Sequence, residues 1–180
     1  MKTLFLVLFL SLVMPSCKKI DLFQDDELSL SRQDYTGNQL RIDGYYYFNY
    51  TNSSIDYIDV YFLYRNGIIL YGFSGLSSEL PDLEESYKDG TFYNQAKSIK
   101  FLWGIHQIEG SSIKFERWYP SEKPYKAYVR EGEIINDTIF TITESYRMKN
   151  GKKSEVESKN EVYHFREFSP KPDSTNSFIQ

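Results

Sequence analysis

Short runs of alternating apolar and polar residues fill most of the chain between residues 40 and 168. In residues 57–65, for example, Ile58, Val60 and Phe62 occupy every second position. Alternate residues of a β-strand point to the same face, so such runs are typical of strands. The pattern predicts eight strands, at residues 40–50, 57–65, 68–74, 99–107, 112–119, 126–135, 138–148 and 156–168.

Turn signals separate most of these strands, among them Asn66-Gly67, Asn136-Asp137 and Asn150-Gly151. Asn-Gly is a strong signal for a tight hairpin, so neighbouring strands are expected to pair antiparallel in a meander. The sequence therefore predicts one all-β domain over residues 38–168. Two arrangements fit: an eight-stranded barrel, in which closure leaves no free edge, or a two-sheet sandwich. An eight-stranded barrel is either filled by side chains or holds one small ligand.

Residues 79–97 interrupt the strands with a helical pattern. Leu80, Leu83 and Tyr87 recur at helical spacing, and Pro81 suits a first turn. Gly90 can end the helix. We therefore expect one short helix near residues 80–89, after the third strand and across an open end of the sheet structure.

The N-terminus predicts secretion. Lys2 precedes an apolar stretch at residues 4–13 that is too short to span a bilayer, so residues 1–16 form a predicted signal peptide. It ends at Met14-Pro15-Ser16-Cys17, which resembles the lipobox of bacterial lipoproteins. In that family a peptidase cleaves before the cysteine, and the thiol and the new amine are acylated. The resemblance implies that acyl chains on Cys17 attach the protein to a membrane.

Lys18 and Lys19 follow the cysteine, and no Asp comes immediately after it. For Gram-negative lipoproteins this implies the outer membrane, with the periplasmic and the surface face both left open. Residues 17–37 are expected to form the lipidated cysteine and a flexible tether. Residues 169–180, which are rich in Pro and small polar residues, are expected to form a disordered tail.

Composition narrows the function classes. A net charge of −4 argues against a nucleic-acid partner, which is normally met by a basic surface. The content of 26% charged residues excludes a polytopic membrane protein. The single cysteine allows no intramolecular disulfide.

Two family resemblances bear on the domain. Gly44-Tyr45-Tyr46 and Arg166 stand roughly where lipocalins have a Gly-any-Trp motif and the arginine that packs across its aromatic residue. The chain also resembles uncharacterised bacterial lipoproteins over most of residues 38–168, including the stretches 103–105, 114–120 and 132–138. These resemblances imply a lipocalin-like barrel and carry no function.

No motif predicts catalysis. His106 and His164 are not spaced like ligands of one metal, so we expect no metal site and no cofactor, and we interpret His106 as a surface or rim residue. A buried Glu116 or Arg117 would be costly unless it were paired, and would mark either a ligand site or a structural network.

The high content of aromatic residues, 17%, gives the leading hypothesis. We predict a non-catalytic lipoprotein whose barrel binds a small apolar or aromatic ligand. The alternative is a protein-interaction subunit of a cell-envelope assembly, with exposed tyrosines against its partner. The predicted ligand-binding residues are Tyr45, Tyr47, Trp103, Phe115, Arg117 and Phe140.

Overall fold

The computed structural model describes residues 24–120 and 123–180. The predicted signal peptide, the predicted lipidation site Cys17 and the first part of the predicted tether lie outside the described residues. Within the described part, no helix is long and apolar enough to cross a membrane.

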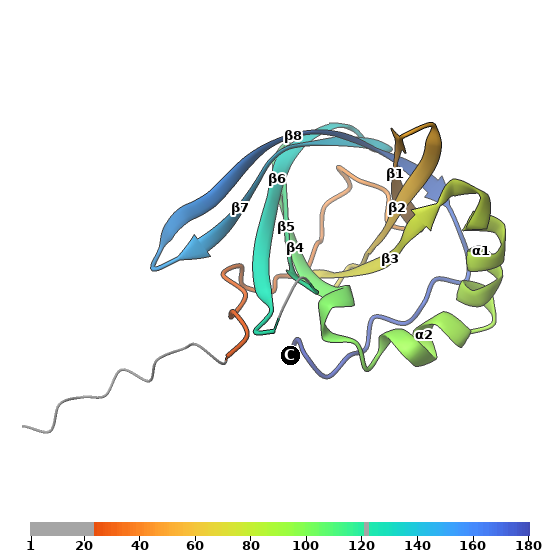
Figure 1. Cartoon of the computed structure of the whole chain (residues 1–180), viewed down its shortest axis with the longest axis horizontal. Coiled ribbons are helices and arrows are strands. Elements are labelled where there is room, and N and C mark those ends of the chain that lie inside the picture. The colour runs from red at the N-terminus through yellow and green to blue at the C-terminus, as the bar shows by residue number, and fades with distance from the viewer. Residues whose placement is uncertain (1–23, 121–122) are drawn as a thin grey trace, which may run out of the picture.

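The chain forms a closed barrel of eight antiparallel strands in sequence order (Figure 1). Tyr45 and Tyr47 of the first strand lie opposite Arg166 and His164 of the last, and this pairing closes the ring. Closure decides between the two predicted arrangements in favour of the barrel. The strands are β1 (Gly44–Asn52), β2 (Ile55–Leu63), β3 (Ile68–Leu76), β4 (Trp103–Glu109), β5 (Ser112–Tyr119), β6 (Lys126–Asn136), β7 (Ile139–Lys149) and β8 (Lys152–Glu167).

The start of β8 differs from the expectation. Asn150 and Gly151 both have positive φ angles, 52° and 72°, as the two central residues of a tight hairpin turn require. Such a turn lets pairing begin directly after it, and Lys152 therefore lies opposite Lys149. The strand begins four residues before the predicted residue 156.

The predicted short helix is present as α1 (Leu80–Lys88). A second helix, α2 (Thr91–Ala96), follows it. Gly90 has a φ of 79° and separates the two, and the Asp89 carboxylate accepts a hydrogen bond from the Thr91 amide at 2.8 Å. The helices do not lie across an end of the barrel. They lie beside its outer face (Figure 1). There the Tyr87 ring packs edge-on against Phe62 of β2.

Because the barrel is covered from outside, both faces of several strands are apolar. The side chains inside the barrel form an inner core: Leu40, Tyr46, Tyr61, Leu63, Ile69, Ile113, Phe115, Phe140, Ile142 and Tyr163. Those between the barrel wall, the helices and the C-terminal tail form an outer core, with Tyr45, Val60, Phe62, Leu70, Tyr87, Ala96, Trp103, Trp118 and Phe168 among its members.

The two ends of the barrel differ. We name the end with the β2–β3, β4–β5 and β6–β7 turns the strap end, because residues 24–43 run to it along the barrel wall. There Leu40 is 2% exposed, and the Tyr35 amide donates to the Arg65 carbonyl at 2.7 Å. We name the opposite end, with the β1–β2 and β7–β8 turns and the β5–β6 loop, the rim end.

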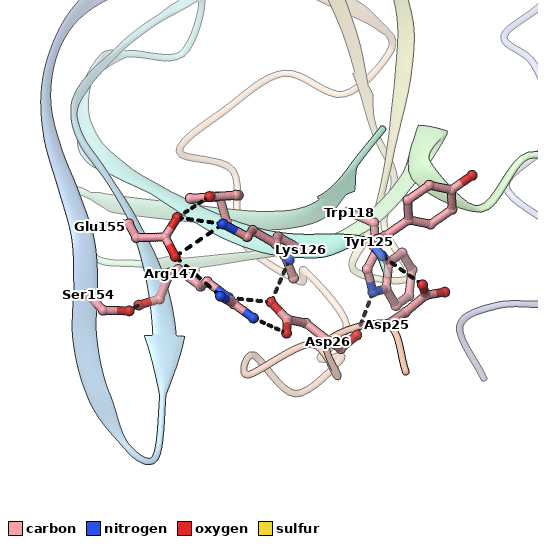
Figure 2. A network of polar contacts seen from close by, with 10 residues as sticks. Asp25, Asp26, Trp118, Tyr125, Lys126, Arg147, Ser154 and Glu155 are labelled. Atoms are coloured by element: carbon pink, nitrogen blue, oxygen red, sulfur yellow. Dashed lines mark hydrogen bonds and ion pairs between the residues drawn. The ribbon is translucent and has the colours of Figure 1, made fainter. Parts of the chain in front are cut away.

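The strap, residues 24–43, corrects the expectation of a flexible tether over residues 17–37 for the residues described. The buried Glu116 carboxylate accepts hydrogen bonds from the amides of Ser29 and Leu30 at 2.6 and 2.8 Å. Asp26 is held by Arg147 through two hydrogen bonds of 2.6 Å, and its carbonyl accepts from Trp118 Nε1 (Figure 2). Scattered polar contacts of this kind leave no periodic pattern in the sequence.

The expected disordered tail, residues 169–180, is also ordered against the barrel. The Lys171 ammonium donates to the carbonyls of Ile42 and Leu63, both at 2.7 Å. Its burial lowers its pKa to about 8. The Ile179 side chain is 8% exposed and belongs to the outer core. The tail has no regular secondary structure, but single side chains fix it.

The strap gives a test in acid. Burial alone would raise the pKa of Asp26, but the hydrogen bonds from Arg147 and Ala127 hold it below its usual value. A lowered carboxyl pKa stabilises the folded form above the unfolded pKa, and this contribution is lost as the pH falls through the folded pKa. We expect fluorescence from Trp118 to be constant at neutral pH and to change below about pH 4, as the strap loosens.

Asp26→Asn should remove much of this acid step and loosen the strap at neutral pH, which limited proteolysis before residue 35 would detect. Asp34→Asn, at an exposed position of the same strap, is the control. An acid step of equal size in Asp26→Asn would contradict this role.

Candidate functional site: an arginine–tyrosine cluster inside the barrel

Two arginines lie on the inner face of the barrel toward the rim end. Alternation along β5 points Phe115, Arg117 and Tyr119 inward and Glu116 outward. Arg130 of β6 lies opposite Phe115 and therefore points inward as well. With their neighbours they form the arginine–tyrosine cluster: Arg117, Arg130, Tyr61, Tyr71, Tyr119, Tyr163 and Glu161.

Arg117 is the most deeply buried cation of this cluster, at 4% exposure. Its guanidinium carbon lies 3.9 Å from the ring centres of both Tyr71 and Tyr119, so two aromatic faces enclose the charge. One nitrogen donates to the carbonyls of Phe101 and Trp118 at 3.2 and 3.1 Å. Among the described residues, no carboxylate forms an ion pair with Arg117, and its Nε has no hydrogen-bond partner.

The positive charge of Arg117 persists despite this burial. Burial alone would lower its pKa, but the hydroxyls of Tyr119, Tyr61 and Tyr71 raise it above the usual value. Arginine stays protonated in proteins in any case. The barrel thus holds a permanent cation near one end.

Arg130 is neutralised by a neighbour. It forms an ion pair with Glu161 at 2.6 Å, in which each side chain is 12% exposed. The same arginine donates to the hydroxyls of Tyr119 and Tyr163 at 2.9 and 3.1 Å. Since Glu161 compensates Arg130, the cluster keeps one net positive charge, on Arg117.

Tyr61 adds a second unused polar atom. Its ring packs against Tyr71 and Phe115, and its hydroxyl has no hydrogen-bond partner among the described residues. Burial raises its pKa, although Arg117 and Arg130 oppose that shift. A buried unsatisfied polar group costs about 1–3 kcal/mol, so Arg117 Nε and the Tyr61 hydroxyl are the two polar atoms of the cluster that a polar partner would stabilise.

A row of stacked rings leads from the cluster to the rim. We call Tyr163, Phe48, Tyr50 and Tyr57 the aromatic ladder. Phe48 lies 5.6 Å from Tyr163 and 5.6 Å from Tyr50, with the last pair nearly parallel at 19°. Tyr50 stacks in turn on Tyr57 at 5.3 Å and is 36% exposed. The ladder gives the rim end an aromatic wall.

The structure divides the six predicted ligand-binding residues between two faces. Phe115, Arg117 and Phe140 lie inside the barrel, and the rings of Phe115 and Phe140 are 6.5 Å apart. The other three belong to the outer core or pack against it, under the helices and the tail: Tyr45, Tyr47 and Trp103. The inner three and the outer three cannot form one site, because the wall of the barrel separates them.

Two of the three outer residues, Tyr45 and Trp103, have structural partners instead. The Tyr45 hydroxyl donates to Glu84 of α1 at 2.6 Å. The Trp103 indole donates to the Ala96 carbonyl at the end of α2 at 2.8 Å. These contacts attach the helices to the barrel wall, and Arg166, opposite Tyr45 in the sheet, forms an ion pair with Glu84 at 3.0 Å.

Of the seven members of the cluster, sequence reasoning predicted Arg117 and missed the other six: Tyr61, Tyr71, Tyr119, Arg130, Glu161 and Tyr163. A signal was present for Arg130, which is a charged residue within a strand. His106 was also misplaced: it is 1% exposed, and its Nε2 contacts the Tyr64 carbonyl at 2.9 Å. Burial lowers its pKa to about 4.

Other candidate sites are weaker. A surface pocket of about 760 Å³ lies between the strap, the β5–β6 loop and the β7–β8 turn. Two of its main charges, Asp26 and Arg147, are paired with each other, so they hold the strap in place. Within the described residues, no group of three or more His, Cys, Asp or Glu side chains is arranged to hold a metal ion.

Comparison with protein-family models, with curated proteins and with solved structures gave no match for this chain. The site is therefore interpreted from its own geometry.

The two arginines should respond differently to mutation. Arg130→Met leaves the Glu161 carboxylate buried without its counter-ion and should lower the free energy of unfolding by about 3–5 kcal/mol. Arg117→Met removes a charge together with its desolvation cost, so a change within about 2 kcal/mol is expected. Urea denaturation followed by circular dichroism measures both.

The double variant Arg130→Met/Glu161→Leu is the matched control, since it removes both charges and should recover part of the loss. Equal, large losses in Arg117→Met and Arg130→Met would show that Arg117 is itself a structural group.

Proposed function

We propose that the protein is a lipoprotein held in the cell envelope by acyl chains on Cys17, at the outer membrane, and that its barrel binds a small ligand without catalysis. The ligand carries an acidic group and an apolar or aromatic part. The observation that supports this proposal is Arg117, a buried cation with an unpaired Nε and no carboxylate partner among the described residues.

A carboxylate or phosphate ligand suits Arg117 in charge and in shape. Guanidinium groups bind such anions through paired, charge-assisted hydrogen bonds, and Nε is a usual member of the pair. The Tyr61 hydroxyl is a further unused polar group close by.

The aromatic ladder is the surface that would contact the apolar part of the ligand. The middle of the barrel is filled, since Phe140 stacks on Tyr163 at 4.8 Å and Phe115 packs against both. A ligand held by Arg117 therefore extends toward the rim, along Tyr50 and Tyr57, and not deeper into the barrel. This refines the sequence hypothesis of a small apolar or aromatic ligand by adding an acidic group.

Binding can be tested with matched probes. We expect the mature domain to bind long-chain and arylalkyl carboxylic acids more tightly than the corresponding alcohols, measured by native mass spectrometry and by competition with a fluorescent fatty acid. Arg117→Met should weaken binding of the acid at least about tenfold, the value of one charge-assisted hydrogen bond. Binding of the alcohol should change little.

Arg41→Met is the control, because Arg41 also stacks on a ring, that of Phe165, but at the strap end. Equal affinity for acid and alcohol, or an unchanged affinity in Arg117→Met, would refute the acidic ligand. No binding of any member of either series would refute the proposed binding function.

The anchor is tested separately. Cys17→Ala removes the only thiol of the chain, so the protein should carry no acyl groups, as mass spectrometry would show, and should move from the membrane fraction to the soluble fraction of cells. A variant with Ser16→Ala should stay in the membrane fraction. Unchanged fractionation of Cys17→Ala would contradict acylation as the anchor.

A further inference from the structure

We infer that the rim end of the barrel rests on the lipid bilayer in which the chain is anchored. This inference depends on the proposed acylation of Cys17. Three observations point to it: where the anchored segment joins the domain, where exposed apolar side chains gather, and how the opposite end is covered.

The anchored segment joins the domain at the rim end. Gln24 lines the surface pocket together with Pro124 of the β5–β6 loop and Asn150 of the β7–β8 turn. Cys17 precedes Gln24 by seven residues, which span at most about 25 Å. Because Asp26 fixes the strap to the barrel wall, this short segment sets how far the rim end lies from the membrane.

The reverse orientation would strain this segment. A strand of nine residues such as β1, tilted as in an eight-stranded barrel, makes the barrel roughly 20–25 Å tall. With the strap end on the bilayer, Gln24 would lie about that far from the surface, so the seven-residue segment would have to be almost fully extended. With the rim end on the bilayer, it remains slack.

Apolar side chains gather at the rim of β1–β3. Tyr50, Ile55 and Leu76 are 36%, 47% and 36% exposed. The strand register places Tyr50 opposite Tyr57, and Tyr57 opposite Leu76, so they form one patch. Tyrosine and aliphatic side chains at the end of an anchored domain suit the interface between headgroups and acyl chains.

Lysines lie on the other side of the same end. Lys123 of the β5–β6 loop and Lys149 at the β7–β8 turn are exposed and line the pocket at which the chain enters. The acidic side chains that face them are Asp25, Asp26 and Glu27. Of these, Asp25 is paired with Lys100 and Asp26 with Arg147. Anionic lipid headgroups attract lysines in this position.

The strap end offers no such surface in the described residues. Leu40 and Tyr35 of the strap cover the inner core there. Ile135 is 60% exposed at that end, but it stands alone beside the polar turn Asn136-Asp137. It therefore provides a matched control position.

The consequence for the site is direct. The aromatic ladder runs from the arginine–tyrosine cluster to the exposed Tyr50 at the rim end, so a ligand with an acidic head and an apolar part would approach Arg117 along the ladder from the plane of the membrane. The bilayer is then the place from which the barrel takes its ligand.

The test uses the full acylated chain in vesicles. A nitroxide label is placed at Ile55→Cys and, in a second variant, at Ile135→Cys, while the acylated Cys17 does not react. We expect the label at position 55 to collide with oxygen, which concentrates in lipid, several-fold more than with a water-soluble nickel chelate. The label at position 135 should show the opposite preference, and anionic lipid should strengthen the difference.

Equal access of the nickel chelate to both labels, with Cys17 unreactive, would overturn the orientation and leave the anchor intact. Labelling of Cys17 in the unmodified chain would show instead that the anchor itself is absent. Protection of position 55 from both reagents in native membranes, but from neither in vesicles, would assign the rim to a protein partner and also overturn the inference.

Discussion

The pairing of β1 with β8 is the constraint on which the rest of this structure depends. Once Tyr45 lies opposite Arg166 and the ring is closed, each strand has a face inside the barrel and a face outside it. The inner face has room for one layer of side chains. The side chains of the inner core fill it, except where Arg117 and Arg130 enter. The outer face of β1–β4 is equally apolar, and so requires the helices and the tail to cover it.

The strap and the tail are held in a different way from the strands. Their backbone contacts end on single charged groups: the carboxylates of Glu116 and Asp26 for the strap, and the ammonium of Lys171 for the tail. Burial raises the pKa of Glu116 even though three hydrogen bonds lower it, so its charge depends on the strap staying in place. Loss of strand pairing would open the closed ring, whereas loss of these charged groups would release the strap and the tail.

The alternation of apolar residues, together with the turn signals, predicted the eight strands, their order and α1. It did not predict which of two aromatic faces is the inner one. Tyr45 and Tyr46 are adjacent and both almost fully buried, one outside and one inside, so composition alone cannot separate them. The members of the site come from five strands, and Glu161 reaches Arg130 only because β8 folds back beside β7. Contacts between distant strands of this kind are set by register, which the pattern of one strand does not contain.

The strap also sets the range over which the domain can move. From Cys17 to the start of β1 there are 27 residues, which would let a free domain reach up to about 95 Å from the anchor proposed at Cys17. The strap, residues 24–43, is held against the barrel, so only seven residues separate Cys17 from the docked part of the chain. The hydrogen bonds to a few carboxylates offset the conformational entropy that the chain loses when the strap docks. The volume open to the domain falls with the cube of the length of free chain, so the local concentration of the domain at the surface rises steeply. In a chain anchored as proposed, detachment of residues 24–43 would convert a barrel held close to the membrane into one that moves through a larger volume above it.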